Sequence, residues 1–343
     1  MKAYEVTIAI PIYNAEKYIR PTLDSALAQL FESIELLILD DCSTDSSMDI
    51  IREYQQTHPH GNDIRIVRQS QNMGIGNARN RIIDEARGKY LYFLDADDTI
   101  EPNTITLMWE AAQANQAQVV LASYVRTEAF RKQPIVETIQ LPSKVFQNED
   151  DLAEYAFQHY GVLRPNVWNV LIDLFFLRTC GLRFVDTNFW EDMAFKYELV
   201  TYVSRAVLLS DFTYHYICRE NSLSNFQSRS EISKSEVLRN VATIDVLKQG
   251  YGRLVGKKYF ANWLAFVLKT DFYIICDVLK KGALIRPSIS KKELQGFLYS
   301  PLTLSETLLY GNIQTLLFKF LSIMPSSAAV MLVKIFGKLK GLV

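Results

Sequence analysis

The sequence predicts an α/β fold in which a mainly parallel central sheet is followed by a mostly helical region. Short apolar runs alternate with amphipathic helical patterns as far as Tyr124. Several of these runs end in acidic or other polar residues. From Glu231 onward the pattern is mostly helical and contains no motif with recognisable chemistry. We therefore expect two domains, residues 1–228 and residues 229–343.

Composition excludes some classes of protein. The chain of 343 residues is 49% hydrophobic and 22% charged, as in ordinary globular proteins. A formal net charge of −1 gives no reason to expect a nucleic-acid partner. Met1–Thr7 leads directly into a strand without a visible signal peptide, and four scattered cysteines without a CxxC pair fit a reduced chain that has no zinc site. We expect a cytoplasmic protein.

The first strand and the first helix can both be predicted from the apolar residues near the N-terminus. Val6–Ile10 is an apolar strand that we expect Pro11 to stop, and Ile12–Asn14 is the following turn. The next segment places apolar residues on one helical face: Ile19, Leu23, Ala26, Leu27 and Leu30.

The second strand, Ile34–Leu39, ends in an acidic turn. Capping of the next helix accounts for Thr44 or Asp45. It does not account for Asp40 and Asp41, which precede the turn at the strand end.

A third strand, Ile64–Val67, leads into a loop with Gly74 and Gly76. These glycines indicate a permissive backbone and do not form a dinucleotide-binding fingerprint. The loop opens the predicted helix Ala78–Ala86, which we expect Gly88 to end. Arg79, on this helix, either reaches the neighbouring acidic strand ends or is a solvated helix charge.

The most informative stretch is Lys89–Asp98. Tyr90–Leu94 is typical of a strand buried on both faces, and it runs into Asp95, Asp97 and Asp98. Such carboxylates need a cation or hydrogen-bond donors, and their hard oxygens suit Mg²⁺ or Mn²⁺ beside a nucleotide pyrophosphate. The alternative is an Asp-rich cap for a helix beginning at Thr99.

Gln118–Tyr124 is a further strand. In a parallel sheet, ligands bind outside the carboxyl ends of the strands. The polar residues after four strands should therefore gather at one edge.

These runs resemble family 2 glycosyltransferases, which have a Rossmann-like GT-A fold. The resemblance rests on IAIPIYNAEKYI, LLILDDCSTDSS, QNMGIGNARNRIIDEARGKYLYFLDADD and NFWEDMAFKYELV, which span about two thirds of the chain. Cys42 stands where the family commonly has Gly, and Val170 where it often has Lys after the Trp-Asn pair.

The resemblance implies a binding site for a nucleotide diphosphate sugar. It places Pro11, Tyr13, Asp40 and Asp41 around the nucleoside, Asp95 at the ribose, and Asp97 with Asp95 on Mn²⁺ or Mg²⁺. Further donor-binding candidates are Asn72, Gly74, Arg79, Arg219 and Ser222. Arg219, Asn221, Ser222 and Ser224 follow the predicted strand around Tyr214 and could bind the diphosphate.

The same resemblance assigns Asp192 as the general base, with Glu191 supporting it. The alternative is that this acidic pair only answers the dipole of a helix N-terminus. His215 could complete a metal shell, but the Tyr214-His215-Tyr216 pattern favours a structural histidine in a strand.

For two further segments the sequence predicts structure but no catalytic or binding residue. Residues 126–149 should form a long connection or β-ribbon over the active-site edge. Phe320–Val333 is too short to cross a membrane and is followed by Lys334, Lys338 and Lys340. It is either an interfacial segment on a membrane surface or a helix packed on the catalytic domain or a partner.

We therefore predict a metal-dependent inverting glycosyltransferase. It would move a sugar from a nucleotide diphosphate, UDP by family frequency, to a hydroxyl of a glycan or lipid-linked saccharide in cell-surface polysaccharide synthesis. The interfacial alternative for Phe320–Val333 would give the protein a peripheral position on the inner face of the cell membrane. A nucleotidyltransferase would need a basic Gly-rich loop after the first strand, which Pro11–Asn14 lacks. A catalytically degenerate nucleotide-binding subunit of a glycan assembly complex is the alternative that is not an enzyme, and Asp95, Asp97 and Asp192 count against it.

Overall fold

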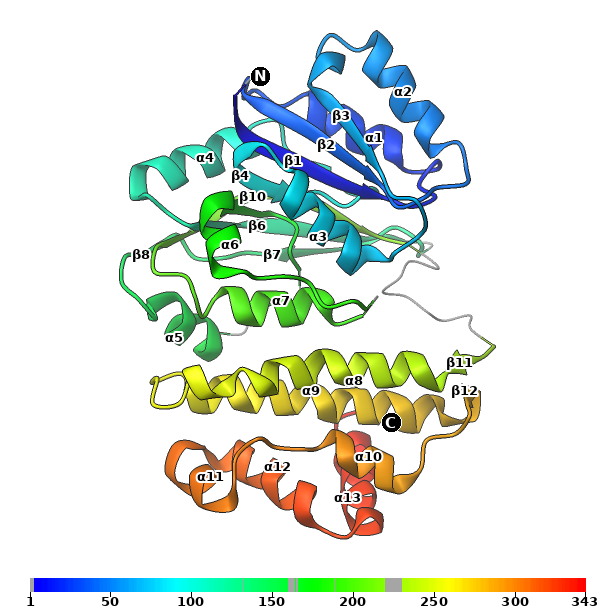
Figure 1. The fold of residues 1–343 in the computed structure, drawn as a ribbon, viewed down its shortest axis with the longest axis vertical. Helices are drawn as coiled ribbons and strands as arrows, with labels where there is room; N and C mark the ends of the chain where they lie inside the picture. The colour runs from blue at the N-terminus through cyan, green and yellow to red at the C-terminus, as the bar shows by residue number, and fades with distance from the viewer. Residues whose placement is uncertain (1–2, 132, 160–163, 165, 188, 220–229) are drawn as a thin grey trace. The chain divides into compact units, whose positions relative to one another are not determined.

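The computed structural model describes residues 3–131, 133–159, 164, 166–187, 189–219 and 230–343 (Figure 1). The chain forms two compact units. The N-terminal unit contains residues 1–152 and 161–225, and the C-terminal unit contains residues 153–160 and 226–343. Most of helix α5 (Asp151–Gln158) thus belongs to the C-terminal unit, which the sequence did not indicate. The predicted boundary at residues 228 and 229 lies outside the described residues.

Among the described residues, ten strands form one sheet in the N-terminal unit, in the order β3-β2-β1-β4-β9-β6-β10-β5, with β7 beside β6 and β8 beside β10. Neighbouring pairs among β3, β2, β1 and β4 are parallel, as are β6 and β10, whereas β9 runs antiparallel between β4 and β6. This arrangement confirms the predicted α/β fold with a mainly parallel sheet. The strands are β1 (Tyr4–Ile12), β2 (Ile34–Asp40), β3 (Ile64–Arg68), β4 (Gly88–Phe93), β5 (Thr99–Ile100), β6 (Val119–Glu128), β7 (Ile135–Ile139), β8 (Lys144–Phe146), β9 (Val170–Asp173) and β10 (Ala206–Cys218).

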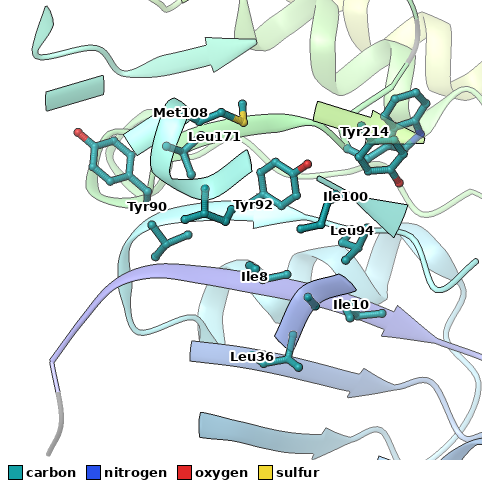
Figure 2. Close-up of a cluster of buried hydrophobic side chains, with 14 of the residues drawn as sticks. Ile8, Ile10, Leu36, Tyr90, Tyr92, Leu94, Ile100, Met108, Leu171 and Tyr214 are labelled. Atoms are coloured by element: carbon teal, nitrogen blue, oxygen red, sulfur yellow. The ribbon is translucent and has the colours of Figure 1, made fainter. Parts of the chain in front are cut away.

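The central strands form because their apolar residues are buried on both faces. Ile8 pairs with Leu36 on one side and with Tyr92 on the other, and all three are buried. One face packs against helices α1 (Ile19–Leu27), α2 (Ser47–Thr57) and α4 (Thr104–Asn115), where Met108 joins the core (Figure 2). Helices α3 (Ile75–Glu85) and α6 (Leu174–Cys180) pack on the other face.

Two details near the N-terminus differ from expectation. Pro11 does not stop β1, which continues to Ile12. Strand β4 pairs with β1 only as far as Ala9, so Pro11 lies where β1 has a single neighbour and tolerates the missing N–H. Leu30 lies beyond the end of α1 and is exposed, because the helix stops at Leu27.

The acidic stretch does not cap a helix at Thr99. Thr99–Ile100 forms β5, and α4 begins at Thr104 after the N-cap Asn103. Gly88 also differs from expectation, because it starts β4 rather than ending α3. A Cβ on Gly88 would lie 2.4 Å from the Thr7 nitrogen, so this glycine permits the close approach of β4 to β1.

The segment from residue 126 to 149 adds two antiparallel strands rather than a structureless connection. Strand β7 extends the pairing of β6, and β8 pairs with the start of β10. The described residues of this segment thus form β structure, and its predicted position over the active-site edge stays a prediction.

The C-terminal unit is helical, as predicted. A short parallel pair, β11 (Ile232–Ser233) and β12 (Ile285–Arg286), flanks helices α8 (Lys234–Gln249) and α9 (Phe260–Lys281). Four shorter helices follow: α10 (Lys291–Phe297), α11 (Leu304–Tyr310), α12 (Ile313–Ile323) and α13 (Ser326–Leu339). The segment Phe320–Val333 is thus divided between α12 and α13 at Pro325. In the part of the chain that is described, no helix is long and apolar enough to cross a bilayer.

Candidate active site

The loops after β1 and β2 are joined by polar contacts at the carboxyl edge of the sheet. Asn14 Oδ1 accepts a hydrogen bond from Thr44 N (2.8 Å), and Asn14 N donates one to Ser43 Oγ (3.2 Å). Asp40 is fully buried, accepts a hydrogen bond from Ser43 N (2.7 Å) and lies 3.0 Å from Arg68 Nε. Asp40 therefore shapes its own loop, and its contact with a nucleoside stays a prediction.

Asp41 connects the second strand to the glycine-containing loop. Its carboxylate accepts hydrogen bonds from Met73 N and Gln69 Nε2 (2.7 Å each) and from Gly74 N (2.9 Å). This holds the backbone at Gly74 (φ 83°) and the exposed Asn72 next to the strand ends. The structure thus gives Asp41 a loop-positioning role, and a direct contact with a base stays a prediction.

The two candidate residues at the end of β1 differ in their exposure to solvent. Pro11 is buried, whereas the Tyr13 ring is 52% exposed and is free to pack against a planar group. Cys42 adopts a φ of 65°, a conformation that favours glycine. This explains physically why a glycine suits position 42.

Helix α3 lies close to residues 184–187 because position 76 is a glycine. A Cβ on Gly76 would lie 2.4 Å from a backbone oxygen of that segment. Asn80 forms two hydrogen bonds with the Phe184 backbone (2.8 Å each). The Phe184 ring stacks on the ring of Phe195, with centroids 4.0 Å apart. Phe195 belongs to α7 (Glu191–Leu199), so α3 is brought against the start of α7.

Arg79 occupies this junction and joins three acidic residues. One terminal nitrogen lies 3.1 Å from Glu191 Oε1 and forms a short ion pair with Asp192. The other lies 3.2 Å from Asp95 Oδ1. Arg79 is almost completely buried, so it holds the acidic groups together instead of being a solvated helix charge. Its predicted contact with the donor remains a prediction.

Burial and charge set the protonation of this cluster. Burial alone would lower the pKa of Arg79, but Asp192, Asp95 and Glu191 outweigh it and raise that pKa. Burial raises the pKa of Asp192 well above its usual value; Arg79 opposes this effect, and Glu191 and Asp95 add to it. Arg79 therefore favours the ionised form of Asp192, which is the form that can accept a proton.

Asp97 lies in a second ion pair at the same edge. Its carboxylate pairs with Arg219, which follows β10 directly. The Arg219 guanidinium carbon lies 3.5 Å from the centroid of the Tyr18 ring. No sequence pattern singles out Tyr18, because a tyrosine at the start of a helix more often belongs to the surface.

Asp98 has a different role from its neighbours. It is fully buried and accepts hydrogen bonds from the Tyr214 hydroxyl and from Ile217 N (2.7 and 2.8 Å). Burial raises its pKa well above the usual value, Asp95 adds to this, and both hydrogen bonds oppose it. Asp98 thus fastens the acidic turn to β10, and each of its carboxylate oxygens accepts one of these hydrogen bonds.

Lys196 is a buried residue of the site region that sequence reasoning missed. Its Nζ donates to the backbone and side-chain oxygens of Asn166 (3.2 and 3.4 Å). Burial lowers the pKa of Lys196 to about 7, and Asp192 opposes this effect. The available signal was its position one helical turn after Asp192, between the apolar residues Phe195 and Tyr197.

Two remaining candidates lie elsewhere or cannot be placed. His215 Nε2 lies 2.6 Å from Glu101 Oε1, which fits the structural reading of this histidine. Ser222, with Asn221 and Ser224, lies outside the described residues.

The acidic pair Asp95 and Asp97 fits a divalent cation only as a partial ligand set. Both carboxylates are partly exposed, with side-chain exposures of 27% and 35%. In the described portion of the chain, no group of three or more His, Cys, Asp or Glu side chains is placed to hold a metal. Mg²⁺ is commonly held by one or two carboxylates together with water and substrate phosphates, which matches this donor set.

A mainly parallel sheet with acidic groups at its carboxyl edge defines an α/β domain of the GT-A type. Residues 7–159 match the model of the family described as glycosyl transferase family 2, to which this part of the chain is similar. The computed structure is similar to that of Staphylococcus aureus TarS 1-349 in complex with UDP-GlcNAc, with a TM-score of 0.71 and 16% identity over 96% of this chain and 89% of that one. It is also similar to the mannosyltransferase PcManGT from Pyrobaculum calidifontis in complex with GDP-Man and Mn²⁺, with a TM-score of 0.51 and 15% identity over 98% and 88%.

The chain is also similar to two curated relatives. The chain is 27% identical to the uncharacterized glycosyltransferase EpsJ of Bacillus subtilis over 64% of its length, and it spans 62% of that relative. It is 26% identical to the succinoglycan biosynthesis protein ExoO of Rhizobium meliloti over 82% of its length and 80% of that relative.

Proposed function

We propose that the chain is a glycosyltransferase that uses a nucleotide diphosphate sugar, with its active site at the carboxyl edge of the N-terminal unit. The observation that carries this proposal is the Arg79 junction. It joins Asp95, at the end of the strand stretch that resembles the family's donor site, to Asp192, on a helix more than ninety residues later. The proposed donor site and the proposed base would thereby be held beside one another.

The donor would lie over the loops after β1, β2 and β3. Tyr13 offers an exposed ring for the base, and Asp41 fixes the loop carrying Asn72 and Gly74. The structural relatives in complex with UDP-GlcNAc and GDP-Man support a sugar nucleotide as the ligand class. We take UDP as the nucleotide by family frequency.

The diphosphate would lie near Asp97 and Arg219. Mn²⁺ or Mg²⁺, held by Asp97 with Asp95, would neutralise charge on the departing diphosphate. The Arg219 guanidinium can pair with either a carboxylate or a phosphate, and its present partner is Asp97. Donor entry would therefore exchange one anionic partner of Arg219 for another.

The transfer would be a single displacement with inversion at the anomeric carbon. Asp192 accepts the proton of the acceptor hydroxyl as its oxygen bonds to the sugar carbon. The bond from that carbon to the diphosphate oxygen breaks, and the nucleoside diphosphate leaves with the electron pair. Arg79 keeps Asp192 in place and favours its ionised form, and Glu191 shares the same guanidinium.

The acceptor and setting complete the proposal. The similarity to ExoO supports an acceptor hydroxyl on a glycan or lipid-linked saccharide in polysaccharide synthesis. We place the reaction in the cytoplasm, at the inner face of the cell membrane. A catalytically degenerate binding subunit would share the fold and would bind donor without turnover.

Nucleotide binding with and without Mn²⁺ tests the donor and metal assignments. Asp97→Ala should abolish the Mn²⁺-dependent part of UDP binding in calorimetry, because it removes the proposed cation ligand. Asp49→Ala, an exposed aspartate on α2, is the matched control and should bind as the wild type does. Wild-type Mn²⁺ dependence in the Asp97 variant would show that the metal assignment is wrong.

Donor hydrolysis separates the enzyme from the degenerate subunit. A thermal-shift screen of nucleotide sugars first identifies the donor that binds. Slow, metal-stimulated release of nucleoside diphosphate from that donor is the expected result. Binding without any release, in the presence of Mn²⁺, would favour the subunit.

A further inference from the structure

The last three helices of the C-terminal unit expose an unusual amount of apolar side chain. On α12, Ile313, Leu317, Phe320 and Ile323 are between 46% and 76% exposed and lie on one helical face. On α13, Met331, Ile335, Phe336 and Leu339 are between 46% and 78% exposed. Leu308 and Leu309 of the adjoining α11 are also exposed. We call these ten residues the C-terminal apolar surface.

The opposite faces of these helices already have their packing partners. Helix α12 turns Phe318 toward Phe272 of α9, and Asn312 at its N-cap donates to the Ala261 carbonyl (3.2 Å). Helix α13 buries Ala329, Val330, Val333 and Gly337. The exposed residues are therefore a second apolar side, which a helix folded only against its own unit does not need.

Charge identifies the kind of partner. Residues 311–343 contain Lys319, Lys334, Lys338 and Lys340 and no acidic residue, although the whole chain has a net charge of −1. Met331, Ile335 and Leu339 recur at spacing i, i+4, i+8, with the exposed Lys334 and Lys338 beside them. An apolar stripe bordered by lysines is the pattern of a helix that lies in the surface of an anionic bilayer.

We propose that the C-terminal apolar surface binds the headgroup region of an anionic lipid bilayer. The apolar side chains enter the acyl boundary, and the lysine stems lie along it with their ammonium groups at the phosphates. A second copy of this chain fits less well, because the three helices of each surface and the C-terminal residues after them carry four lysines against one acidic residue, Glu306 of α11, so that two such surfaces would repel one another. The inference does not depend on the transfer reaction, since none of its residues belongs to the proposed active site.

Vesicle flotation of the full chain tests this inference. Wild-type protein should float with vesicles of phosphatidylcholine and phosphatidylglycerol at about 0.01 M salt. It should float much less at about 1 M salt, where the screening length falls to ~3 Å. It should also float poorly with phosphatidylcholine alone.

Two pairs of variants separate the apolar and the charged contributions. Leu317→Gln with Phe320→Gln should lower the partition coefficient roughly tenfold or more, whereas Phe175→Gln, which changes an even more exposed ring on α6, should not. Lys334→Gln with Lys338→Gln should lower it by roughly fivefold for each lysine. Lys291→Gln with Lys292→Gln, exposed lysines at the start of α10, is the charge control.

Three results would overturn the inference: wild-type protein that does not float with anionic vesicles, binding that ignores salt and lipid charge, or Leu317 and Phe320 variants that float as the wild type does. A stable oligomer that light scattering detects and that the Leu317→Gln, Phe320→Gln variant dissociates would assign the surface to a second copy instead.

Discussion

At the scale of single residues, the site depends on one buried arginine. Arg79→Gln would leave Asp95, Glu191 and Asp192 close together without their shared cation. Breaking a buried ion pair from one side typically costs about 3–5 kcal/mol, so we expect a loss of this size in the free energy of unfolding. Urea denaturation measures it, and Arg79→Lys should recover part of the loss.

The same helix supplies a control. Arg81 pairs with Glu85 on the surface of α3, with its side chain 54% exposed. Arg81→Gln should change the free energy of unfolding by less than about 0.5 kcal/mol. Equal effects of the Arg79 and Arg81 variants would contradict the central role given to Arg79.

Lys196 predicts a pH dependence of stability. Its pKa is about 7 in the folded protein, against an ordinary value of 10.5, so between these values the unfolded chain binds more protons. The free energy of unfolding should therefore rise with pH across this window, relative to a variant that lacks the amine. Urea denaturation of wild type and Lys196→Met at pH 7, 8 and 9 measures the difference. If the difference in the free energy of unfolding between the two proteins were the same at all three pH values, Lys196 would not lose its proton on folding.

At the scale of elements, the contact between α3 and residues 184–187 places the acidic groups. Gly76→Ala would put a methyl group 2.4 Å from a backbone oxygen, so one of the two segments must move. We expect a transfer rate lowered at least roughly tenfold, because small displacements of catalytic groups are costly. Radiolabelled sugar transfer measures the rate.

Gly296→Ala is the matched control for the Gly76→Ala variant. A Cβ at position 296, in α10, meets no atom within 4 Å, and alanine favours helix. This variant should keep wild-type activity and stability or gain slightly in stability. If Gly76→Ala behaved in the same way, the close approach would not matter for the site.

The elements differ in how far the sequence could predict them. The strand at Tyr90–Leu94 could be predicted because a short, unbroken apolar run is typical of a strand buried on both faces. The start of α4 was misplaced because Thr99 and Ile100 pair with β10, more than one hundred residues away. Distance along the chain also explains why two ion pairs of Arg79 were not predicted, because Glu191 and Asp192 lie 112 and 113 residues further on. Its pair with Asp95 agrees with the predicted contact with an acidic strand end. The break between α12 and α13 could be predicted from Pro325. The exposed faces of these two helices could not, because they depend on how the helices pack in the folded unit.

At the scale of the whole molecule, the two units carry different tasks in this account. The N-terminal unit gathers side chains from strand ends and from α3 and α7 into one acidic, arginine-linked site. The C-terminal unit is helical and presents lysines beside exposed apolar residues. Because the proposed tasks use separate residues, a variant that loses membrane binding should retain donor hydrolysis, and the active-site variants should retain flotation.

The central claim is that Asp192 is the base of a sugar transfer. Asp192→Asn keeps the shape of the side chain and removes its basic oxygen, while Asp211→Asn changes an exposed aspartate on β10 as a control. The most direct test measures transfer to an acceptor and donor affinity for both variants. We predict that Asp192→Asn lowers transfer by roughly 10²–10⁴-fold with near wild-type donor affinity, and that Glu191→Gln lowers it less. Transfer by Asp192→Asn at a rate close to that of the wild type and of Asp211→Asn would contradict the account.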